Sequence, residues 1–174
     1  MVSHIEVTGL ALDSRKVEPG MVFIALPGHQ GHGMQHVDHA VCRGAIAVLY
    51  DHWLDGIPSA IPCLAIPLLK ERLGRLAQAF YGHPSHSMHT IGVTGTNGKT
   101  TTVHFIGQLA DCLGIKAGRV GTLGVFSGNE QLYGPERTTP DALSLARYAA
   151  DFRARGISVC ALEVSSHGLD QFRV

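Results

Sequence analysis

Residues 92–101 read Gly-Val-Thr-Gly-Thr-Asn-Gly-Lys-Thr-Thr and lie between an apolar stretch that predicts a strand and an amphipathic stretch that predicts a helix. A glycine-rich turn in this place lets backbone N–H groups point at a phosphate, and the positive end of the helix adds to the attraction. Lys99 can reach the β- and γ-phosphates, and the Thr100 hydroxyl can ligate Mg²⁺. The segment predicts a nucleoside-triphosphate site made of Gly95, Thr96, Asn97, Gly98, Lys99, Thr100 and Thr101.

The glycine spacing departs from the usual phosphate loop, which has a glycine where this chain has Val93. The alternative interpretation is a plain glycine-rich turn with a solvated lysine. The position of Gly-Lys-Thr-Thr between a strand and a helix favours the phosphate loop.

A second segment, residues 162–173, reads Leu-Glu-Val-Ser-Ser-His-Gly-Leu-Asp-Gln-Phe-Arg. Residues 95–101 resemble the ATP loop of the Mur ligase family, and this second segment resembles the MurE type within that family. The resemblance runs from about Leu10 to the last residue. It implies a ligase that uses ATP and Mg²⁺ to form an acyl phosphate. That enzyme adds a diamino acid, meso-diaminopimelate or L-lysine, to UDP-N-acetylmuramoyl-L-alanyl-D-glutamate.

The expected catalytic residues are Lys99 and Glu163. Charge accumulates on a transferring phosphoryl group, so a lysine and a metal ion must lie close to it. Glu163 ends a predicted strand, where a carboxylate can hold Mg²⁺ directly or through water, and the resemblance implies that Thr100 and Glu163 share the metal. The alternative for Glu163 is an ordinary carboxylate at the end of a strand.

The resemblance also implies residues that contact the UDP-linked substrate: Leu12, Ser14, His29, Gln30, Gly31, Thr138, Thr139, Ser165, Gln171 and Arg173. Arg137 is left out because the family often has asparagine there. Simpler interpretations stay open: a turn and a glycine loop before residue 32, and a helix start at Thr138-Thr139-Pro140. A serine nucleophile at Ser165 with His167 as its base is disfavoured, because residues two apart on a strand share a face without needing contact.

Composition limits the possible functions. Hydrophobic residues make up 45% of the 174 residues, charged residues 16%, and the formal net charge is zero. These values suit a buried α/β protein and disfavour nucleic acid as a partner, because phosphate backbones bind basic faces. No apolar run is long enough to span a membrane, and the first residues lack the features of a signal peptide. We therefore expect a cytoplasmic protein without a membrane partner, with Cys42, Cys63, Cys112 and Cys160 as reduced, buried thiols.

A cluster of histidines invites a metal-site interpretation: His29, His32, His36 and His39. Three nearby glycines and the absence of a neighbouring cysteine favour a polar loop and helix start instead. The role of the cluster is left open.

The pattern of apolar runs predicts alternating strands and helices and hence parallel pairing. Strands are expected at 21–26, 45–50, 62–66, 88–94 and 157–162, and helices at 34–43, 68–81, 100–113 and 141–155, with a linker at 82–87. We expect an α/β fold, with a small amino-terminal UDP-substrate domain at 1–84. The start of an incomplete phosphate-loop, parallel-sheet ATPase domain is expected at 85–174.

The resemblance further implies that a carbamylated lysine, a metal-binding histidine and an amino-acid-binding domain follow in full-length relatives. We expect the 174 residues to be a truncated portion that forms no amide bond alone. Three alternatives are another Mur-like amide ligase such as folylpolyglutamate synthetase, a GTPase-type switch and a nucleotide-binding remnant. The substrate-domain pattern disfavours the first, and the lack of an Asn-Lys-x-Asp motif disfavours the second.

Overall fold

The computed structural model describes residues 6–28, 31–52, 56 and 60–174. Its contacts divide the chain into two compact units, Met1–Arg72 and Leu73–Val174. This division falls inside the helix α2 (Leu69–Phe80). The functional border expected after residue 84 stays a prediction.

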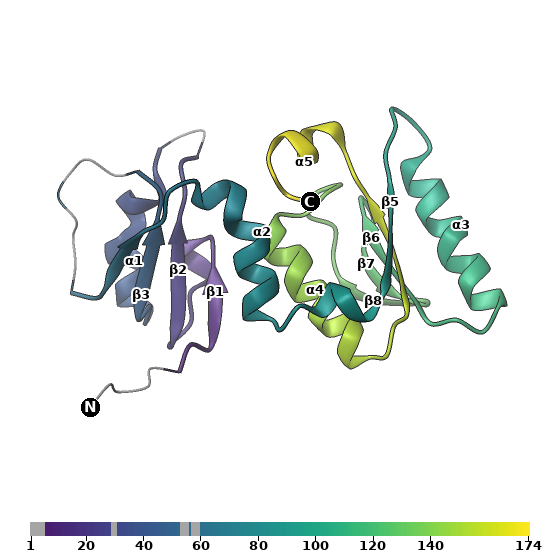
Figure 1. The fold of residues 1–174 in the computed structure, drawn as a ribbon, viewed down its shortest axis with the longest axis horizontal. Helices are drawn as coiled ribbons and strands as arrows, with labels where there is room; N and C mark the ends of the chain where they lie inside the picture. The colour runs from purple at the N-terminus through teal and green to yellow at the C-terminus, as the bar shows by residue number, and fades with distance from the viewer. Residues whose placement is uncertain (1–5, 29–30, 53–55, 57–59) are drawn as a thin grey trace. The chain divides into compact units, whose positions relative to one another are not determined.

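The first unit contains a four-stranded sheet in which every neighbouring pair is parallel (Figure 1). Its strands follow the order β1 (Gly9–Ala11), β2 (Met21–Ala25), β3 (Ala47–Tyr50) and β4 (Cys63–Ala65). The connections carry short helices: η1 (Ser14–Lys16), η2 (Gly33–His36) and α1 (Val37–Cys42). The strands expected in this half are confirmed, and β1 is an addition to them.

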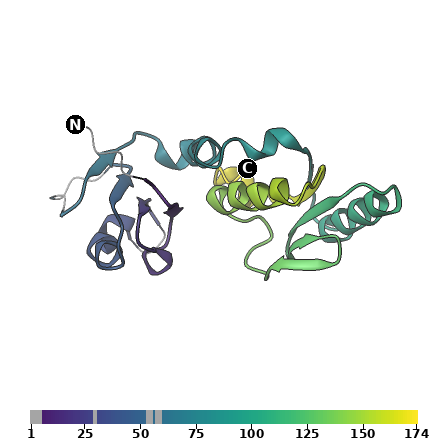
Figure 2. The same cartoon turned by 90° about the horizontal axis from the view of Figure 1, so that it is seen from below.

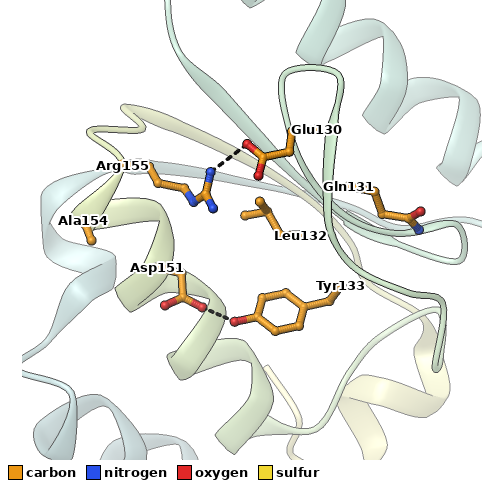
Figure 3. A pocket seen from close by; sticks show the side chains of 7 residues that line it. All are labelled: Glu130, Gln131, Leu132, Tyr133, Asp151, Ala154 and Arg155. Carbon is orange, nitrogen blue, oxygen red and sulfur yellow. Dashed lines mark hydrogen bonds and ion pairs between the residues drawn. The ribbon is translucent and has the colours of Figure 1, made fainter.

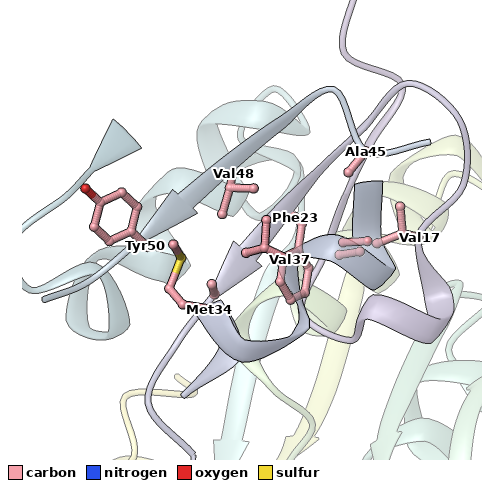
Figure 4. Close-up of a cluster of buried hydrophobic side chains, with 10 residues drawn as sticks. Val17, Phe23, Met34, Val37, Ala45, Val48 and Tyr50 are labelled. Carbon is pink, nitrogen blue, oxygen red and sulfur yellow. The ribbon is translucent and has the colours of Figure 1, made fainter. Parts of the chain in front are cut away.

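The core of the first unit forms where α1 and η2 cover the sheet (Figure 4). Phe23 from β2 and Val48 from β3 pack with Met34 and Val37, and each of the four is at most 1% exposed. The burial of each such side chain stabilises the fold by about 1.5–3 kcal/mol. The apolar run at β2 therefore anchors the sheet in the core, and the nearby polar loops connect to this sheet.

The second unit contains a five-stranded mixed sheet. Its elements are, after α2, η3 (Pro84–Ser87), β5 (His89–Val93), α3 (Lys99–Cys112), β6 (Ala117–Gly121), β7 (Gly124–Ser127), β8 (Glu130–Tyr133), α4 (Ala142–Ala154), β9 (Val159–Glu163) and α5 (Ser166–Asp170). The spatial order is β5-β9-β6-β7-β8.

The α/β fold class is confirmed, but the expectation of parallel pairing throughout is wrong for the hairpin β7–β8. Strands β5, β9 and β6 are parallel, whereas β7 pairs antiparallel with both β6 and β8. The connection from β7 to β8 is only two residues long, and a tight hairpin of this kind forces antiparallel pairing. In Figure 2 the green hairpin runs beside the teal helix α3.

Helices α3 and α4 cover opposite faces of this sheet. A Cβ on Gly118 would lie 2.5 Å from Phe152 of α4, and a Cβ on Gly107 of α3 would lie 2.5 Å from the Arg119 side chain. Gly118 and Arg119 are neighbours on β6, so they point to opposite faces. Both glycines thus permit a close approach between a helix and the sheet.

The strand β5 is exposed along most of its length, because His89, Thr90, Ile91 and Gly92 all have exposed positions. One flank of α3 is also apolar and exposed, with Phe105, Leu109 and Leu113 at 58%, 65% and 75% exposure. The opposite flank carries His104, which contacts Arg119 of β6 and Phe126 of β7.

Two other expectations bear on the fold. The four cysteines are free thiols as expected, but Cys42 and Cys112 are exposed, so the expectation that all four are buried is wrong. Among the described residues, no helix is long and apolar enough to cross a membrane.

Candidate nucleotide and substrate sites

The glycine-rich loop connects β5 to α3, as the sequence predicts. Gly95 and Gly98 have φ values of +146° and +80°, a region that residues with a side chain rarely adopt. The helix α3 then begins at Lys99, with Gly98 as its N-cap. The first N–H groups of a helix have no partner within the helix, so the start of α3 offers donors and a positive dipole end to an anion.

The Lys99 ammonium lies over this loop. Its Nζ donates to the carbonyl oxygens of Gly95, at 2.6 Å, and of Thr96, at 3.4 Å. The charge is therefore held beside the loop and not extended into solvent. A phosphate placed on the loop would meet both the backbone donors and the ammonium group.

Glu163 is the last residue of β9 and is only 1% exposed. Its Oε2 accepts a hydrogen bond from the Thr100 hydroxyl at 3.0 Å, which brings together the two residues expected to share a metal. Hydroxyl and carboxylate oxygens are ligands of the kind that Mg²⁺ takes, together with phosphate oxygens and water. These residues therefore fit Mg²⁺, which would neutralise phosphate charge there.

Thr122, which was not among the residues predicted from the sequence, holds the same carboxylate. The Thr122 backbone N–H donates to Glu163 Oε1 at 2.9 Å, and the Thr122 hydroxyl lies 3.2 Å from Oε2. The neighbouring Gly121 leaves room for this contact, because a Cβ there would lie 2.1 Å from Oε1. The available signal was the Gly-Thr-x-Gly sequence at 121–124, but nothing local links it to residue 163.

Thr139 and Ser165 form a hydrogen-bonded junction behind the end of β9. The Thr139 hydroxyl lies 3.0 Å from the Glu163 carbonyl oxygen, and it accepts from the Ser165 N–H at 2.9 Å. The Ser165 Oγ accepts from Gly168 N–H at 3.0 Å and caps α5. Thr139 is only 1% exposed, so the structure gives it a positioning role. Direct contact of Thr139, Thr138 or Ser165 with substrate stays a prediction.

The segment after Ser165 is a helix, so the expectation that Ser165 and His167 share a strand is wrong. The Ser165 hydroxyl caps the N-terminus of α5. His167 Nε2 lies 2.8 Å from Gln171 Nε2. A serine that caps a helix uses its hydroxyl on the backbone. This arrangement adds to the case against a serine nucleophile.

Arg173 approaches the same junction. Its Nη1 donates to the Thr139 carbonyl oxygen at 2.8 Å, and its Nη2 donates to Gln171 Oε1. Burial, together with the nearby Arg137, lowers the pKa of Arg173 from its usual value. Two neighbouring guanidinium groups favour an anionic ligand. The structure thus brings together Thr138, Thr139, Ser165, Gln171 and Arg173, and it places Arg137, which the sequence analysis left out, close to them.

In the first unit, Leu12 and Ser14 line a cavity of about 660 Å³. The other lining residues are Asp13, Arg15, Phe23, Gly33, His36 and His39. The Ser14 Oγ lies 3.0 Å from His39 Nδ1. Asp13 accepts hydrogen bonds from the Arg15 guanidinium, which lowers the pKa of the Asp13 carboxyl to about 2. The cavity is large enough for a nucleotide-sized group.

The histidine-rich segment has two kinds of role in the structure. His32 caps η2 by accepting from the Met34 N–H at 3.1 Å, whereas His36 and His39 line the cavity of the first unit. Within the described ranges there is no group of three side chains placed to hold a metal ion. Gly31 accepts from the Gly28 N–H at 2.8 Å, while His29 and Gln30 lie outside the described residues.

A further cavity of about 480 Å³ lies in the second unit, between β8 and the end of α4 (Figure 3). Its polar groups are paired with each other: Arg155 donates to Glu130 at 2.8 Å, and the Tyr133 hydroxyl donates to Asp151. Burial and the contact with Asp151 raise the pKa of Tyr133 to about 12. These two pairs connect the hairpin β7–β8 to the end of α4.

The fold and the loop define an α/β protein with a glycine-rich loop between the first strand and the first helix of a sheet. Two family models match the chain. The model described as "Mur ligase family, catalytic domain" matches residues 6–81, and the one described as "Mur ligase middle domain" matches residues 93–174. The chain belongs to the Mur ligase family.

Similar proteins agree with this assignment. The chain is 45% identical, over 175 aligned residues, to a UDP-N-acetylmuramoyl-L-alanyl-D-glutamate–2,6-diaminopimelate ligase of Xanthomonas oryzae pv. oryzae; the match covers 98% of the chain and 34% of the relative. It is 44% identical to the ligase of the same name from Alkalilimnicola ehrlichii, with 97% and 36% covered. The chain thus spans about a third of the length of these relatives.

Solved structures show the same likeness. A structure of a UDP-N-acetylmuramoyl-L-alanyl-D-glutamate–2,6-diaminopimelate ligase has a TM-score of 0.80 and 32% identity, and the match covers 96% of this chain and 34% of that one. A MurF ligase from Thermotoga maritima has a TM-score of 0.62 and 23% identity, with 95% and 34% covered. The second likeness concerns the fold alone.

Proposed function

We propose that the chain is the portion of a MurE-type ligase that holds ATP and part of the UDP-linked substrate. The whole enzyme would add meso-diaminopimelate or L-lysine to UDP-N-acetylmuramoyl-L-alanyl-D-glutamate through an acyl phosphate. The observation that carries the proposal is the contact between Thr100 and Glu163, which joins the phosphate loop to the carboxyl end of β9. The names of the relatives and the structural match support the choice of substrate.

Each part of the site would have its own task in this reaction. A carboxylate is a poor electrophile, and phosphorylation by ATP turns it into one that an amine can attack. The loop donors and Lys99 would bind the phosphates, while Thr100 and Glu163 would hold Mg²⁺ against them. Arg173 presents a guanidinium that can pair with a carboxylate or a pyrophosphate. These groups would position the reacting atoms and place positive charge beside the phosphates. Positioning and electrostatic stabilisation supply most of the rate enhancement in phosphoryl transfer.

The cavity of the first unit would take the UDP end of the substrate. Leu12 and Ser14 line it, and the Ser14 Oγ is within hydrogen-bond distance of His39 Nδ1, at 3.0 Å. His29, Gln30 and Gly31 belong to this proposal from the sequence alone. A cytoplasmic setting also belongs to it, because free thiols persist in reducing compartments.

Ligand-dependent thermal stability tests the proposal. Mg²⁺–ATP and UDP-N-acetylmuramoyl-L-alanyl-D-glutamate should each raise the Tm of the 174-residue chain, by about 5–10 °C at a hundred times Kd. UDP-N-acetylglucosamine tests the need for the peptide, and tetrahydrofolate tests the folylpolyglutamate alternative. A shift with tetrahydrofolate and none with the UDP-linked dipeptide would contradict the proposed substrate.

A product assay tests the expectation that the chain alone forms no amide bond. It is incubated with ATP, Mg²⁺, the UDP-linked dipeptide and either diamino acid, and the tripeptide product is sought by mass spectrometry. Effective molarity requires that both reacting groups have a site. Tripeptide above a no-protein control would show that the 174 residues suffice.

A further inference from the structure

The turn between β6 and β7 carries the exposed residue Thr122. Gly121 precedes it, and a Cβ at Gly121 would lie 2.1 Å from Glu163 Oε1. The turn therefore reaches the Glu163 carboxylate only because residue 121 has no side chain. Because the backbone lies this close to the carboxylate, a movement of the turn must also move the Glu163 side chain.

Thr122 holds both oxygens of the Glu163 carboxylate. Its N–H reaches Oε1 at 2.9 Å, and its hydroxyl lies 3.2 Å from Oε2, the oxygen that also accepts from Thr100. A carboxylate offers about four acceptor positions. Three are used here, and two of the three donors belong to Thr122. The direction in which Glu163 faces the phosphate loop thus depends on this turn.

The Thr122 hydroxyl has a second neighbour, the Thr138 Oγ1 at 3.1 Å. Each hydroxyl has one proton, and the carboxylate can only accept. All three groups are satisfied when Thr138 donates to Thr122 and Thr122 donates to Glu163. Thr138 directly precedes Thr139, which bonds to the Glu163 carbonyl and to Ser165. The loop expected to contact substrate is therefore linked to the Glu163 carboxylate through Thr122 and to the Glu163 carbonyl oxygen through Thr139.

We propose that Thr122 is a positioning residue that couples the metal-binding end of the nucleotide site to the loop at Thr138 and Thr139. The inference rests on the proposed function, because it requires that Thr100 and Glu163 bind Mg²⁺ with the nucleotide. Thr122 aims the carboxylate with its N–H and its hydroxyl, and the same hydroxyl anchors Thr138. A shift of the Thr138 loop then changes the hydrogen bonding of Glu163.

A purely structural turn residue would behave differently. Loss of its hydroxyl would lower the stability of the chain and leave the Mg²⁺ dependence of nucleotide binding unchanged. If Thr122 couples the two sites, loss of its hydroxyl should change the Mg²⁺ dependence of nucleotide binding and leave the stability nearly unchanged. The reason is that the exposed hydroxyl orients one carboxylate and does not pack in the core. Thr122→Val separates the two cases: it keeps the shape and the backbone N–H bond but removes the hydroxyl.

The experiment measures ADP binding to the 174-residue chain by calorimetry at a series of Mg²⁺ concentrations. Thr122→Val should raise the Mg²⁺ concentration for half-maximal ADP binding about three- to tenfold, as expected for the loss of one hydrogen bond. Thr122→Ser, which keeps the hydroxyl, should stay within about twofold of the unmodified chain. Thr90→Val on the exposed strand β5 is the matched control and should have no effect.

Coupling has its own readout in the double variant. Thr138→Val should raise the Mg²⁺ requirement as well, and Thr122→Val/Thr138→Val should cost less than the sum of the single changes, because both remove one chain of hydrogen bonds. Additive effects, or a Thr122→Val titration that matches Thr90→Val, would overturn the inference while ADP binding by the unmodified chain still supported the nucleotide site. No ADP binding by the unmodified chain at any Mg²⁺ concentration would contradict the proposed function itself, and the inference with it.

Discussion

The hydroxyl of Thr100 donates to the buried carboxylate of Glu163 at 3.0 Å, although the two residues are 63 positions apart. Thr100 lies in the first turn of α3, and Glu163 ends β9, the strand that pairs in parallel with β5. The carboxyl ends of parallel strands meet at one edge of a sheet, so the crossover from β5 to β9 brings the two residues together. The predictions for Glu163, Lys99 and Gly121 depend on this edge.

Glu163→Gln tests the metal role. The change keeps the shape and the acceptor oxygen but removes the negative charge, so binding of ADP should require more Mg²⁺, by about tenfold or more for a lost charged contact. Calorimetric titration with Mg²⁺ measures the shift. Asp111→Asn, on the exposed surface of α3, is the control. An unchanged titration would make Glu163 a structural residue.

Lys99→Ala tests the phosphate loop. The ammonium lies against the Gly95 and Thr96 carbonyls, so its loss should weaken ATP binding by roughly ten- to a hundredfold, the range for one charge-assisted hydrogen bond. Fluorescent ATP analogues give the affinity. Lys116→Ala, outside the loop, should bind normally. Equal affinities for the two variants would rule out the phosphate-loop assignment.

Gly121→Ala tests the close approach of the β6–β7 turn. A Cβ 2.1 Å from Glu163 Oε1 must displace either the turn or the carboxylate, at a cost of about 1–3 kcal/mol in unfolding free energy. Urea denaturation measures this cost. Gly134→Ala is the matched control, because a Cβ there would meet no atom within 4 Å. If both variants unfold at the same urea concentration, the approach is looser than described.

The lowered pKa of Asp13 predicts that the stability of the chain falls in acid. Its folded pKa of about 2 is below the ordinary value of 3.8, so the charged form contributes stability above about pH 4, and this contribution is lost as the pH falls towards 2. The Arg15 side chain is 81% exposed, and solvent screening limits the contribution to under about 1 kcal/mol.

Asp13→Asn should therefore be less stable than the unmodified chain at neutral pH, and the difference should disappear near pH 2. Circular dichroism in urea at several pH values follows both proteins. Glu18→Gln, a charge-removing change at an exposed carboxyl group, is the control. A difference that persisted at low pH would show that the charge of Asp13 is not what stabilises the chain.

Thiol labelling separates the cysteines. Burial raises the pKa of the Cys160 thiol to about 12, whereas Cys42 and Cys112 are exposed. Because the thiolate is the nucleophile, iodoacetamide at about pH 8 should label Cys42 and Cys112 in the folded chain and leave Cys160 unmodified until denaturant is added. Peptide mass spectrometry reads each site. Rapid labelling of Cys160 in the folded chain would contradict its burial.

Long periodic segments were predictable from the sequence, and glycine-rich strands were not. The apolar run at β2 and the stripe on α3 each give a clear local signal. The strand β6, with Gly118 and Gly121, has weak strand propensity, and its glycines are needed only because Phe152 and Glu163 approach them. The hairpin β7–β8 did leave a signal, Gly128-Asn129 between two short apolar runs, which is typical of a two-residue turn.

The site divides in the same way. The loop at 95–101 and the strand end at Glu163 could be predicted, because each is a local pattern. The role of Thr122 could not, since its partner is 41 residues away and the contact depends on strand order. The structure likewise gives Thr139 a buried, supporting position that a sequence motif does not distinguish from an exposed one.

The strand β5 leads into the glycine-rich loop that is proposed to bind nucleotide. In the part of the chain that the structure describes, β5 pairs with β9 alone, and most of its residues are exposed. Local opening of β5 from β9 would release the loop without unfolding α4 or the hairpin, so this edge is expected to be the least protected part of the sheet in amide hydrogen exchange. Nucleotide binding would then slow exchange first along β5, and the degree of slowing would report the affinity of the loop for its ligand.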